Sequence, residues 1–307
     1  MKFNRRHFLS TAAAAVTTGA VSTLNAPKLW AASEMTLGSA TLQTLSDGYL
    51  TLPPEFIFGP MPKDQLQSVL ATYEIGDSLT PDCNVTLLRD GNTVALFDVG
   101  AGTAFQDSAG QLLGALEAAG LTPEDVTHVI FTHAHPDHLW GVLDDFDDPL
   151  FLNAQHMMGQ VEWEYWFDPD TVNTIQSERA SMAVGARRRM EVLEDQITLF
   201  QDGDEVLPGV AALASHGHTP GHMAFEVRQG SDAAMIVGDA IGNHHVGFAK
   251  PDWRSGSDQD QEMGVQSRKM LLDRLASEQM ALIGFHLPDG GIGRAERDGT
   301  GYRFVSE

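Results

Sequence analysis

Three histidines and one aspartate lie within six positions of the segment FTHAHPDHLWG, at residues 131–141. Imidazole nitrogens and carboxylate oxygens are both common ligands of divalent metals. His133 and His135 follow an apolar run typical of a strand, whereas Asp137 and His138 come after a proline, where a helix should begin. The two pairs therefore face different directions. One metal cannot easily take all four side chains, so the segment predicts two neighbouring metals with one pair on each.

Further candidate ligands lie at the ends of other apolar runs. The segment SHGHTPGHMAF contains His216, His218 and His222, the strand-like AMIVGDAIG carries Asp239 at its end, and ALIGFHLP carries His286. A polar side chain at the end of an apolar strand points to a site rather than to a core. His216 is expected to be a structural neighbour of the site.

The remaining elements must bring these segments together. Apolar runs on both sides of the DGN turn predict a hairpin over residues 84–100. Residues 171–195 predict one long helix or two, and residues 41–52 predict two short strands about an Asp-Gly turn. Helices are also expected over residues 108–120 and 266–276, and strands near residues 125–133, 197–200, 211–214, 223–227, 233–237 and 280–286. Helices covering mixed sheets indicate a layered α/β sandwich.

Composition narrows the class of partner. The chain has 307 residues and a formal net charge of −23. Such an acidic surface repels phosphate backbones and anionic lipids, so no nucleic-acid and no membrane partner is expected. The partner expected is a small-molecule substrate. Cys83 is the only cysteine, which excludes an intrachain disulfide, and it is expected to be buried.

The first 32 residues are typical of an export signal rather than of a fold. Arg5 and Arg6 precede a short Ala-rich apolar run, and small residues follow near positions 31–33. Adjacent arginines favour a twin-arginine-type signal over an ordinary secretion signal. We therefore expect a signal peptide over residues 1–32, one domain over residues 33–307, and a periplasmic or secreted protein.

The pattern HAHPDH, followed by GHTPGH, GD and a late strand-borne histidine, resembles the metallo-β-lactamase superfamily. The resemblance covers nearly the whole mature chain. It implies an α/β fold, the four-layer αβ/βα sandwich, with two divalent metals at one edge. Asp98, in LFDVGAG, matches a supporting position rather than a ligand, and His222 matches a position that is mostly structural. The resemblance assigns His133, His135 and His218 to the first metal, Asp137, His138 and His286 to the second, and Asp239 as the bridge between them.

Several segments indicate one branch of the superfamily. LASHGHTPGH, HLPDGGIGR and GTGYRFV resemble methyl parathion hydrolase and its relatives, which hydrolyse organophosphate triesters and often aryl esters and lactones. Trp166 matches an aromatic residue of the leaving-group pocket there, and Trp163 and Phe167 are expected to wall the same pocket. The alternative is that this helix packs its aromatic side chains on the core. Gly242 stands where acyl-homoserine lactonases commonly carry tyrosine, and Asp289 places a charge near the expected entrance.

Two adjacent divalent metals share a hydroxide that attacks a carbonyl or phosphoryl centre. Asp137 and Asp239 are the expected catalytic carboxylates, and Asp137 could pass a proton to a poor leaving group. The ligand set suits Zn²⁺, with Mn²⁺, Co²⁺ or Fe²⁺ as alternatives. The leading function is an ester, lactone or organophosphate triester hydrolase. A quorum-quenching acyl-homoserine lactonase, a β-lactamase and a non-catalytic metal-binding protein are the alternatives. Because relatives are often dimers, a homodimer is one expected assembly.

Overall fold

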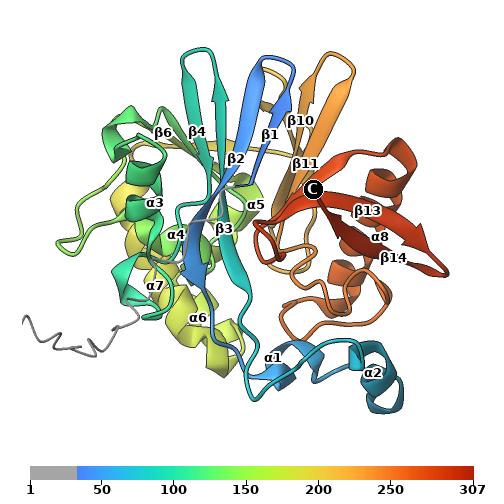
Figure 1. Cartoon of the computed structure of the whole chain (residues 1–307). Coiled ribbons are helices and arrows are strands. Elements are labelled where there is room, and N and C mark those ends of the chain that lie inside the picture. Colours follow the sequence, from blue (N-terminus) through green and yellow to red (C-terminus); the bar gives the residue numbers. More distant parts are fainter. Residues whose placement is uncertain (1–32) are drawn as a thin grey trace, which may run out of the picture.

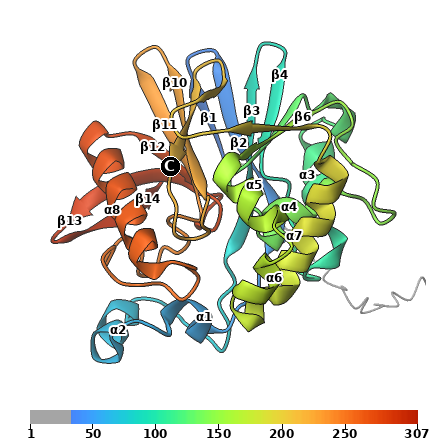
Figure 2. The same ribbon diagram turned by 180° about the vertical axis from the view of Figure 1, so that it is seen from behind.

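The computed structural model describes residues 33–307, and the predicted signal segment over residues 1–32 lies outside them. Two seven-stranded sheets stack face to face, and helices cover the outer face of each sheet (Figures 1 and 2). The helices are α1 (Pro54–Phe58), α2 (Lys63–Leu70), α3 (Leu112–Ala118), α4 (Pro136–Leu139), α5 (Gln160–Phe167), α6 (Thr171–Thr174), α7 (Ala180–Leu193) and α8 (Gln261–Glu278). This arrangement confirms the four-layer αβ/βα sandwich.

The first sheet uses its strands in chain order, with antiparallel pairs up to β4 and parallel pairs from β4 to β7. Parallel strands need crossover connections, which here contain α3, α4 and α5 to α7 in turn. The strands are β1 (Glu34–Leu37), β2 (Ala40–Tyr49), β3 (Asp82–Asp90), β4 (Thr93–Phe97), β5 (His128–Phe131), β6 (Gln155–Gly159) and β7 (Ile197–Phe200).

The second sheet has the order β14-β13-β12-β11-β10-β9-β8, and β11 and β12 form its parallel pair around α8. Its strands are β8 (Glu205–Leu207), β9 (Val210–Ala214), β10 (Met223–Gln229), β11 (Asp232–Gly238), β12 (Ala281–Gly284), β13 (Ile292–Asp298) and β14 (Gly301–Ser306).

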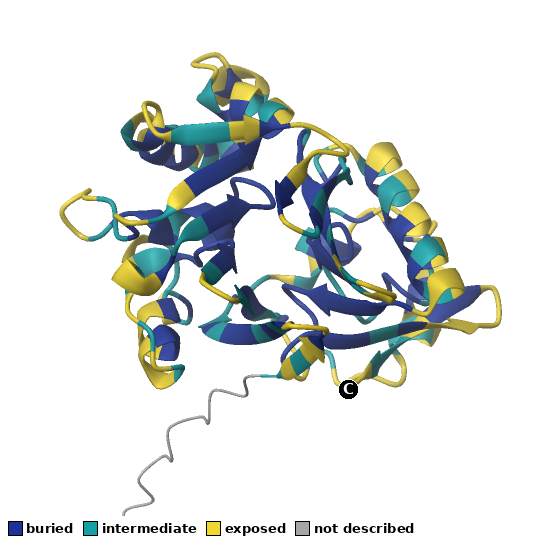
Figure 3. Cartoon of the chain, turned by 90° about the horizontal axis from the view of Figure 1, so that it is seen from above, coloured by how far each residue is buried: buried dark blue, intermediate teal, exposed yellow. Residues whose placement is uncertain are grey.

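Three buried layers hold the sandwich together. The central layer lies between the sheets, where Phe97 from β4 meets Phe225 from β10 with 5.1 Å between the ring centroids. The outer layers pack α3, α5 and α7 on the first sheet and α8 on the second. Strands are therefore buried on both faces, whereas the outward faces of the helices are exposed (Figure 3). The near-continuous apolar run of β5 is confirmed as a buried strand.

Two local predictions are settled by the fold. Residues 41–52 do not form two short strands, because β2 runs unbroken to Tyr49 and only shifts its register between Ser46 and Tyr49. The Asp-Gly pair there is part of a β-bulge rather than of a hairpin turn. Residues 171–195 form two helices, α6 and α7, joined by a short 3₁₀ turn. The hairpin about Gly91 is confirmed.

A small helical segment between β2 and β3 was not expected from the sequence. Helices α1 and α2 lie across one end of the sandwich (Figure 1) and carry a small core of their own. Ile57 and Phe58 of α1 pack there with Val246 from the loop after β11. Among the described residues, no helix is long and apolar enough to cross a membrane.

Candidate metal centre

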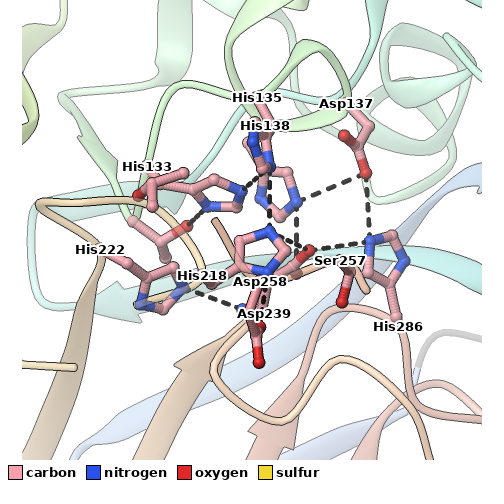
Figure 4. A network of polar contacts seen from close by, with 12 residues as sticks. His133, His135, Asp137, His138, His218, His222, Asp239, Ser257, Asp258 and His286 are labelled. Carbon is pink, nitrogen blue, oxygen red and sulfur yellow. Dashed lines mark hydrogen bonds and ion pairs between the residues drawn. The ribbon is translucent and has the colours of Figure 1, made fainter. Parts of the chain in front are cut away.

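All the ligand candidates come from chain segments that leave the sheets at one edge. His133 and His135 follow β5, Asp239 follows β11, His286 follows β12, and His218 lies in the loop between β9 and β10. Asp137 and His138 lie in the short helix α4. The fold therefore brings the seven predicted side chains together from both halves of the chain, and Figure 4 shows them converging.

The first group consists of three buried imidazoles. Nε2 of His133 lies 3.0 Å from Nδ1 of His135, and Nε2 of His218 lies 2.9 Å from the same Nδ1 (Figure 4). Burial, the largest effect, and the neighbouring imidazoles hold the pKa of His133 and of His135 well below the usual 6.5. The rings of His133 and His135 are therefore neutral, which is the form that binds metals.

The second group combines two imidazoles with two carboxylates. Nε2 of His286 lies 3.1 Å from Oδ2 of Asp137 and 3.2 Å from Oδ2 of Asp239. Nε2 of His138 lies 3.4 Å from Oδ2 of Asp137 and 3.3 Å from Oδ1 of Asp239. Oδ2 of Asp239 also lies 3.3 Å from Nε2 of His218 in the first group. Asp239 thus stands between the two groups, as a bridging ligand would.

Hydrogen bonds on the far side of the rings orient the lone pairs toward the centre. The Thr132 hydroxyl donates to Oδ2 of Asp98 over 2.8 Å, so it accepts from Nδ1 of His133, 2.9 Å away. Nδ1 of His138 donates to Asp98 over 2.8 Å, and Nδ1 of His286 donates to the Asp82 carbonyl over 2.7 Å. In its neutral form each imidazole has a single N–H, which these bonds place on Nδ1, so Nε2 would then present a lone pair to the centre.

The donor set fits a pair of divalent cations. Nε2 of His138, Oδ2 of Asp137 and Oδ1 of Asp239 are buried atoms without a hydrogen-bond partner. Burial opposes the charged imidazolium form, yet Asp239 and Asp137 raise the pKa of His138 well above 6.5. The same carboxylates raise the pKa of His286. The centre therefore attracts positive charge, which a proton or a metal cation can supply.

Asp98 supports the centre without being a ligand. Its carboxylate accepts hydrogen bonds from Thr132 and from His138, and it is fully buried. Burial raises the pKa of Asp98, and the neighbouring His138 opposes that rise. Its backbone adopts φ 67°, which is rare for a non-glycine residue and turns the chain sharply after β4. This is the supporting role that the sequence predicts for it.

His222 also supports the centre. Its Nε2 accepts a hydrogen bond from the backbone N–H of Asp239 over 3.0 Å, and its Nδ1 lies 2.8 Å from the Ser215 hydroxyl. The ring therefore holds the segment that carries the bridging carboxylate. His216 is half-buried, and its carbonyl accepts from Ser267. Both histidines are structural neighbours, as expected.

Glu162 was missed by sequence reasoning. This fully buried residue of α5 accepts from the Ala134 backbone N–H over 2.8 Å and from Trp166 Nε1 over 2.6 Å through Oε1. Its Oε2 accepts from the Thr219 hydroxyl over 2.7 Å and from the Gly221 backbone N–H over 3.0 Å. Burial raises the pKa of Glu162 against these hydrogen bonds. The Glu162 carboxylate thus links the loop that carries His133 and His135 to the loop that carries His218. The sequence feature that could have indicated this role is a carboxylate four residues before a tryptophan on an apolar helix face.

The centre opens into a cavity of about 210 Å³. His135, Asp137, His218, Asp239 and His286 border it, whereas His133 and His138 lie behind them and are fully buried. The opposite wall is mainly apolar and comes from the segment between β2 and β3. The apolar side chains of that segment that line the cavity are Leu50, Leu52, Phe56, Ile57, Ile75, Leu79 and Pro81.

The three aromatic residues predicted to wall the pocket lie elsewhere, and that prediction is corrected. Trp166 is fully buried under His135 and bonded to Glu162, and Trp163 and Phe167 stack on each other with 4.9 Å between their centroids. None of the three borders the cavity. Their helix packs its aromatic face on the core, which was the alternative reading of the sequence.

Other residues near the centre differ in whether they border the cavity. Gly242, His244 and His245 line the cavity, so both histidines after the bridging aspartate reach the pocket. Asp289 is exposed and does not border it, although its charge raises the pKa of His244 against the larger effect of burial. Cys83 is fully buried at the start of β3, as expected, and burial raises its pKa to about 12.

Similar solved structures share this architecture. The dizinc quorum-quenching lactonase AidC, in complex with N-hexanoyl-L-homoserine, superposes with a TM-score of 0.84 at 23% identity, covering 90% of this chain and 97% of that one. The hydrolase AbOPH of the β-lactamase superfamily gives a TM-score of 0.83 at 25% identity, with the same coverage.

Sequence relatives match over a smaller share of the chain. An uncharacterized protein of Mycobacterium tuberculosis is 27% identical over 206 residues, covering 64% of this chain and 82% of that protein. The N-acyl homoserine lactonase AttM of Azorhizobium caulinodans is 28% identical over 125 residues, covering 40% of this chain and 43% of that protein. The family model for the metallo-beta-lactamase superfamily matches residues 80–277, about two thirds of the chain. With its fold and its His/Asp centre, the chain belongs to the metallo-β-lactamase superfamily.

Proposed function

We propose that this protein is a dinuclear metal-dependent hydrolase whose preferred substrates are lactones and esters. The observation that carries the proposal is the position of Asp239. Its carboxylate lies between two groups of imidazoles at the wall of a mainly apolar cavity. The similarity in fold to the lactonase AidC and in sequence to the lactonase AttM supports lactones as the first substrates to test.

The residues that would hold the metals are those that converge at the sheet edge. His133, His135 and His218 would hold one ion, Asp137, His138 and His286 the other, and Asp239 both. We propose zinc for both positions, because imidazole and carboxylate ligands suit it and AidC is a dizinc enzyme. Bound ions would polarise the scissile carbonyl and lower the pKa of the attacking water.

The chain's own side chains position the reactants. The apolar wall excludes water from around the acyl group and favours neutral substrates. Asp137 borders the cavity and has an oxygen without a hydrogen-bond partner. It can hold the proton released by the attacking water and deliver it to the leaving alkoxide. An alkoxide needs that proton more than a phenolate does, so Asp137 matters most for lactones.

Organophosphate triesters are the second candidate substrates. The segments HLPDGGIGR and GTGYRFV, which resemble the methyl parathion hydrolase branch, favour them. Export to the periplasm by the twin-arginine-type segment over residues 1–32 belongs to the same proposal. It is tested by the N-terminal sequence of protein recovered outside the cytoplasm.

The test combines metal analysis with a substrate panel. Purified protein should contain about two equivalents of divalent metal and should hydrolyse members of a panel of N-acyl homoserine lactones, alkyl lactones, p-nitrophenyl esters and paraoxon-type triesters. Nitrocefin tests the β-lactamase alternative. Asp239→Ala should lose both metal and turnover. One equivalent or less after reconstitution, or turnover undiminished in Asp239→Ala, overturns the proposal.

A further inference from the structure

The imidazole of His218 has one nitrogen at the metal centre and the other on its far side. Nε2 lies 3.3 Å from Oδ2 of Asp239, whereas Nδ1 is buried and makes no hydrogen bond of good geometry among the described residues. A metal at the first position would take Nε2, so the single N–H of the neutral ring would lie on Nδ1. Because a buried N–H without an acceptor is costly, Nδ1 requires an acceptor behind the ring.

Asp258, in the loop before α8, is the carboxylate that lies behind the His218 ring (Figure 4). Its Oδ1 lies 3.4 Å from Nδ1, and both side chains are buried. A shift of about 0.4 Å would bring the two atoms to the usual N–H···O distance of about 3.0 Å. A carboxylate that accepts from the far nitrogen of a ligand histidine fixes the orientation of the ring and strengthens it as a ligand.

Arg268 of α8 occupies the second oxygen of Asp258 and leaves the first to His218. Its Nη1 donates to Oδ2 of Asp258 over 3.3 Å, and both residues are buried. Its Nε and Nη2 donate to the carbonyls of Pro251 and Trp253 over 3.2 and 2.8 Å, so backbone groups fix the guanidinium. A buried ion pair is weak evidence for a role in stability. The contact of this pair with a ligand histidine therefore indicates a role at the centre.

The backbone joins the same loop to the His218 loop. The Gln259 N–H donates to the His218 carbonyl over 3.1 Å. Gly217 adopts φ 123°, and a Cβ there would lie 2.1 Å from the backbone nitrogen of Gly264 in α8. The two segments are therefore in direct contact, with no room for a side chain between them. Asp258 stands where a candidate metal ligand meets the first turns of α8.

We propose that Asp258 orients His218 at the first metal position and thereby couples metal binding to the start of α8. With Nε2 bound, Nδ1–H donates to Oδ1 of Asp258 and holds the loop over residues 255–260 against the ligand. Ser257 of that loop borders the cavity, so the same bond fixes part of the cavity wall. Asp258 does not border the cavity and is a positioning residue. The inference rests on the dinuclear centre of the proposed function.

The test measures the stepwise zinc affinities of wild type and variants by competition with a chelator, and His218→Ala identifies the step that belongs to the first position. Asp258→Ala should lower the affinity of the first position about 10- to 100-fold, as is typical when the partner of a ligand is lost, and should change the second position much less. Asp258→Asn keeps an oxygen that can accept from Nδ1, so it should recover part of the loss.

Asp260→Ala is the matched control in the same loop. The Asp260 side chain accepts from the Met263 N–H over 3.0 Å and caps α8 rather than contacting the His218 ring. Its loss should lower the stability of the metal-free protein and leave both zinc affinities unchanged.

Two spectroscopic measurements separate orientation of the ring from a purely structural role. In ¹H NMR of the zinc-loaded wild type, the Nδ1–H of His218 should be protected from exchange with water, and Asp258→Ala should lose that protection. Zinc should also slow amide hydrogen exchange over residues 259–264 in wild type and not in Asp258→Ala.

Unchanged zinc affinities in Asp258→Ala, with lower stability of the metal-free protein, would leave only a structural pair with Arg268 and overturn the inference. If Asp258→Ala does not fold, the zinc-loaded wild type decides, because an unprotected Nδ1–H of His218 overturns the inference and a protected one supports it. Wild-type protein that binds fewer than two equivalents of zinc after reconstitution overturns the proposed function instead.

Discussion

Replacing Glu162 by glutamine should weaken the first metal position and destabilise the fold. The amide can reproduce only one of the two carboxylate oxygens. Its better orientation directs the NH₂ group at Thr219, whose hydroxyl can accept, and leaves the Gly221 N–H without an acceptor. One unpaired buried N–H costs about 1–3 kcal/mol, and the remaining bonds lose the assistance of the charge. We therefore expect the free energy of unfolding to fall by about 2–4 kcal/mol.

The effect should concentrate on the loop that carries His218. Thr219 and Gly221 follow that ligand in the chain. The affinity for the first metal should therefore fall about 10- to 100-fold, as is typical when a partner that supports a ligand is lost. Urea unfolding and competition with a chelator measure the two effects. Glu164→Gln on the same helix is the control, because Glu164 is exposed and bonds only to Gln160 among the described residues. Unchanged stability and affinity in Glu162→Gln would refute the reasoning.

The remaining predictions concern two other buried carboxylates. Asp98→Asn should lower the affinity of the second metal position about 10- to 100-fold more than that of the first, because Asp98 orients His138. A two-step metal-binding isotherm measures both affinities, and an equal loss at the two positions would count against the prediction. Burial raises the pKa of Asp47 to about 6 from 3.8, against hydrogen bonds that include those from the backbone N–H groups of Ala101, Gly110 and Leu112. The folded state therefore holds the extra proton, and stability falls as pH rises from about 4 to 6. The difference corresponds to about 3 kcal/mol. Asp47→Asn should not show this pH-dependent part of the stability when urea unfolding is measured at the two pH values. A pH dependence identical to that of the wild type would contradict the raised pKa of Asp47.

Local signals were sufficient for the metal centre. His133 and His135 leave a buried strand directly, and Asp239 and His286 stand at or near the ends of two other apolar strands. The direction of a strand decides where the next few side chains point, so ligand types and strand ends predicted which side chains would meet. The prediction that the four ligands of the first motif divide into two pairs followed from the change from strand to helix at Pro136.

The sequence pattern gave the wrong prediction for α5, because an apolar helix face can pack either on the core or on a pocket. The aromatic residues Trp163 and Trp166 are compatible with a pocket wall or with a core, and their spacing is the same in both cases. Packing of α5 against α7 and the bond from Trp166 to Glu162 place them in the core. The strand β2 was divided in two because an Asp-Gly pair serves a turn and a bulge equally well.

By itself, the sequence predicted the candidate ligands, the resemblance to the superfamily and the α/β order of elements, because these depend on residue types next to short apolar runs. The tertiary structure alone decided what surrounds the ligands. Phe56, Leu79 and Arg179 come from segments distant in the chain, and they share one cavity only because the segment between β2 and β3 lies across the end of the sandwich, where Phe56 meets Arg179 (Figure 1). Non-local contacts of this kind leave no periodic pattern in any one segment, and substrate choice depends on them.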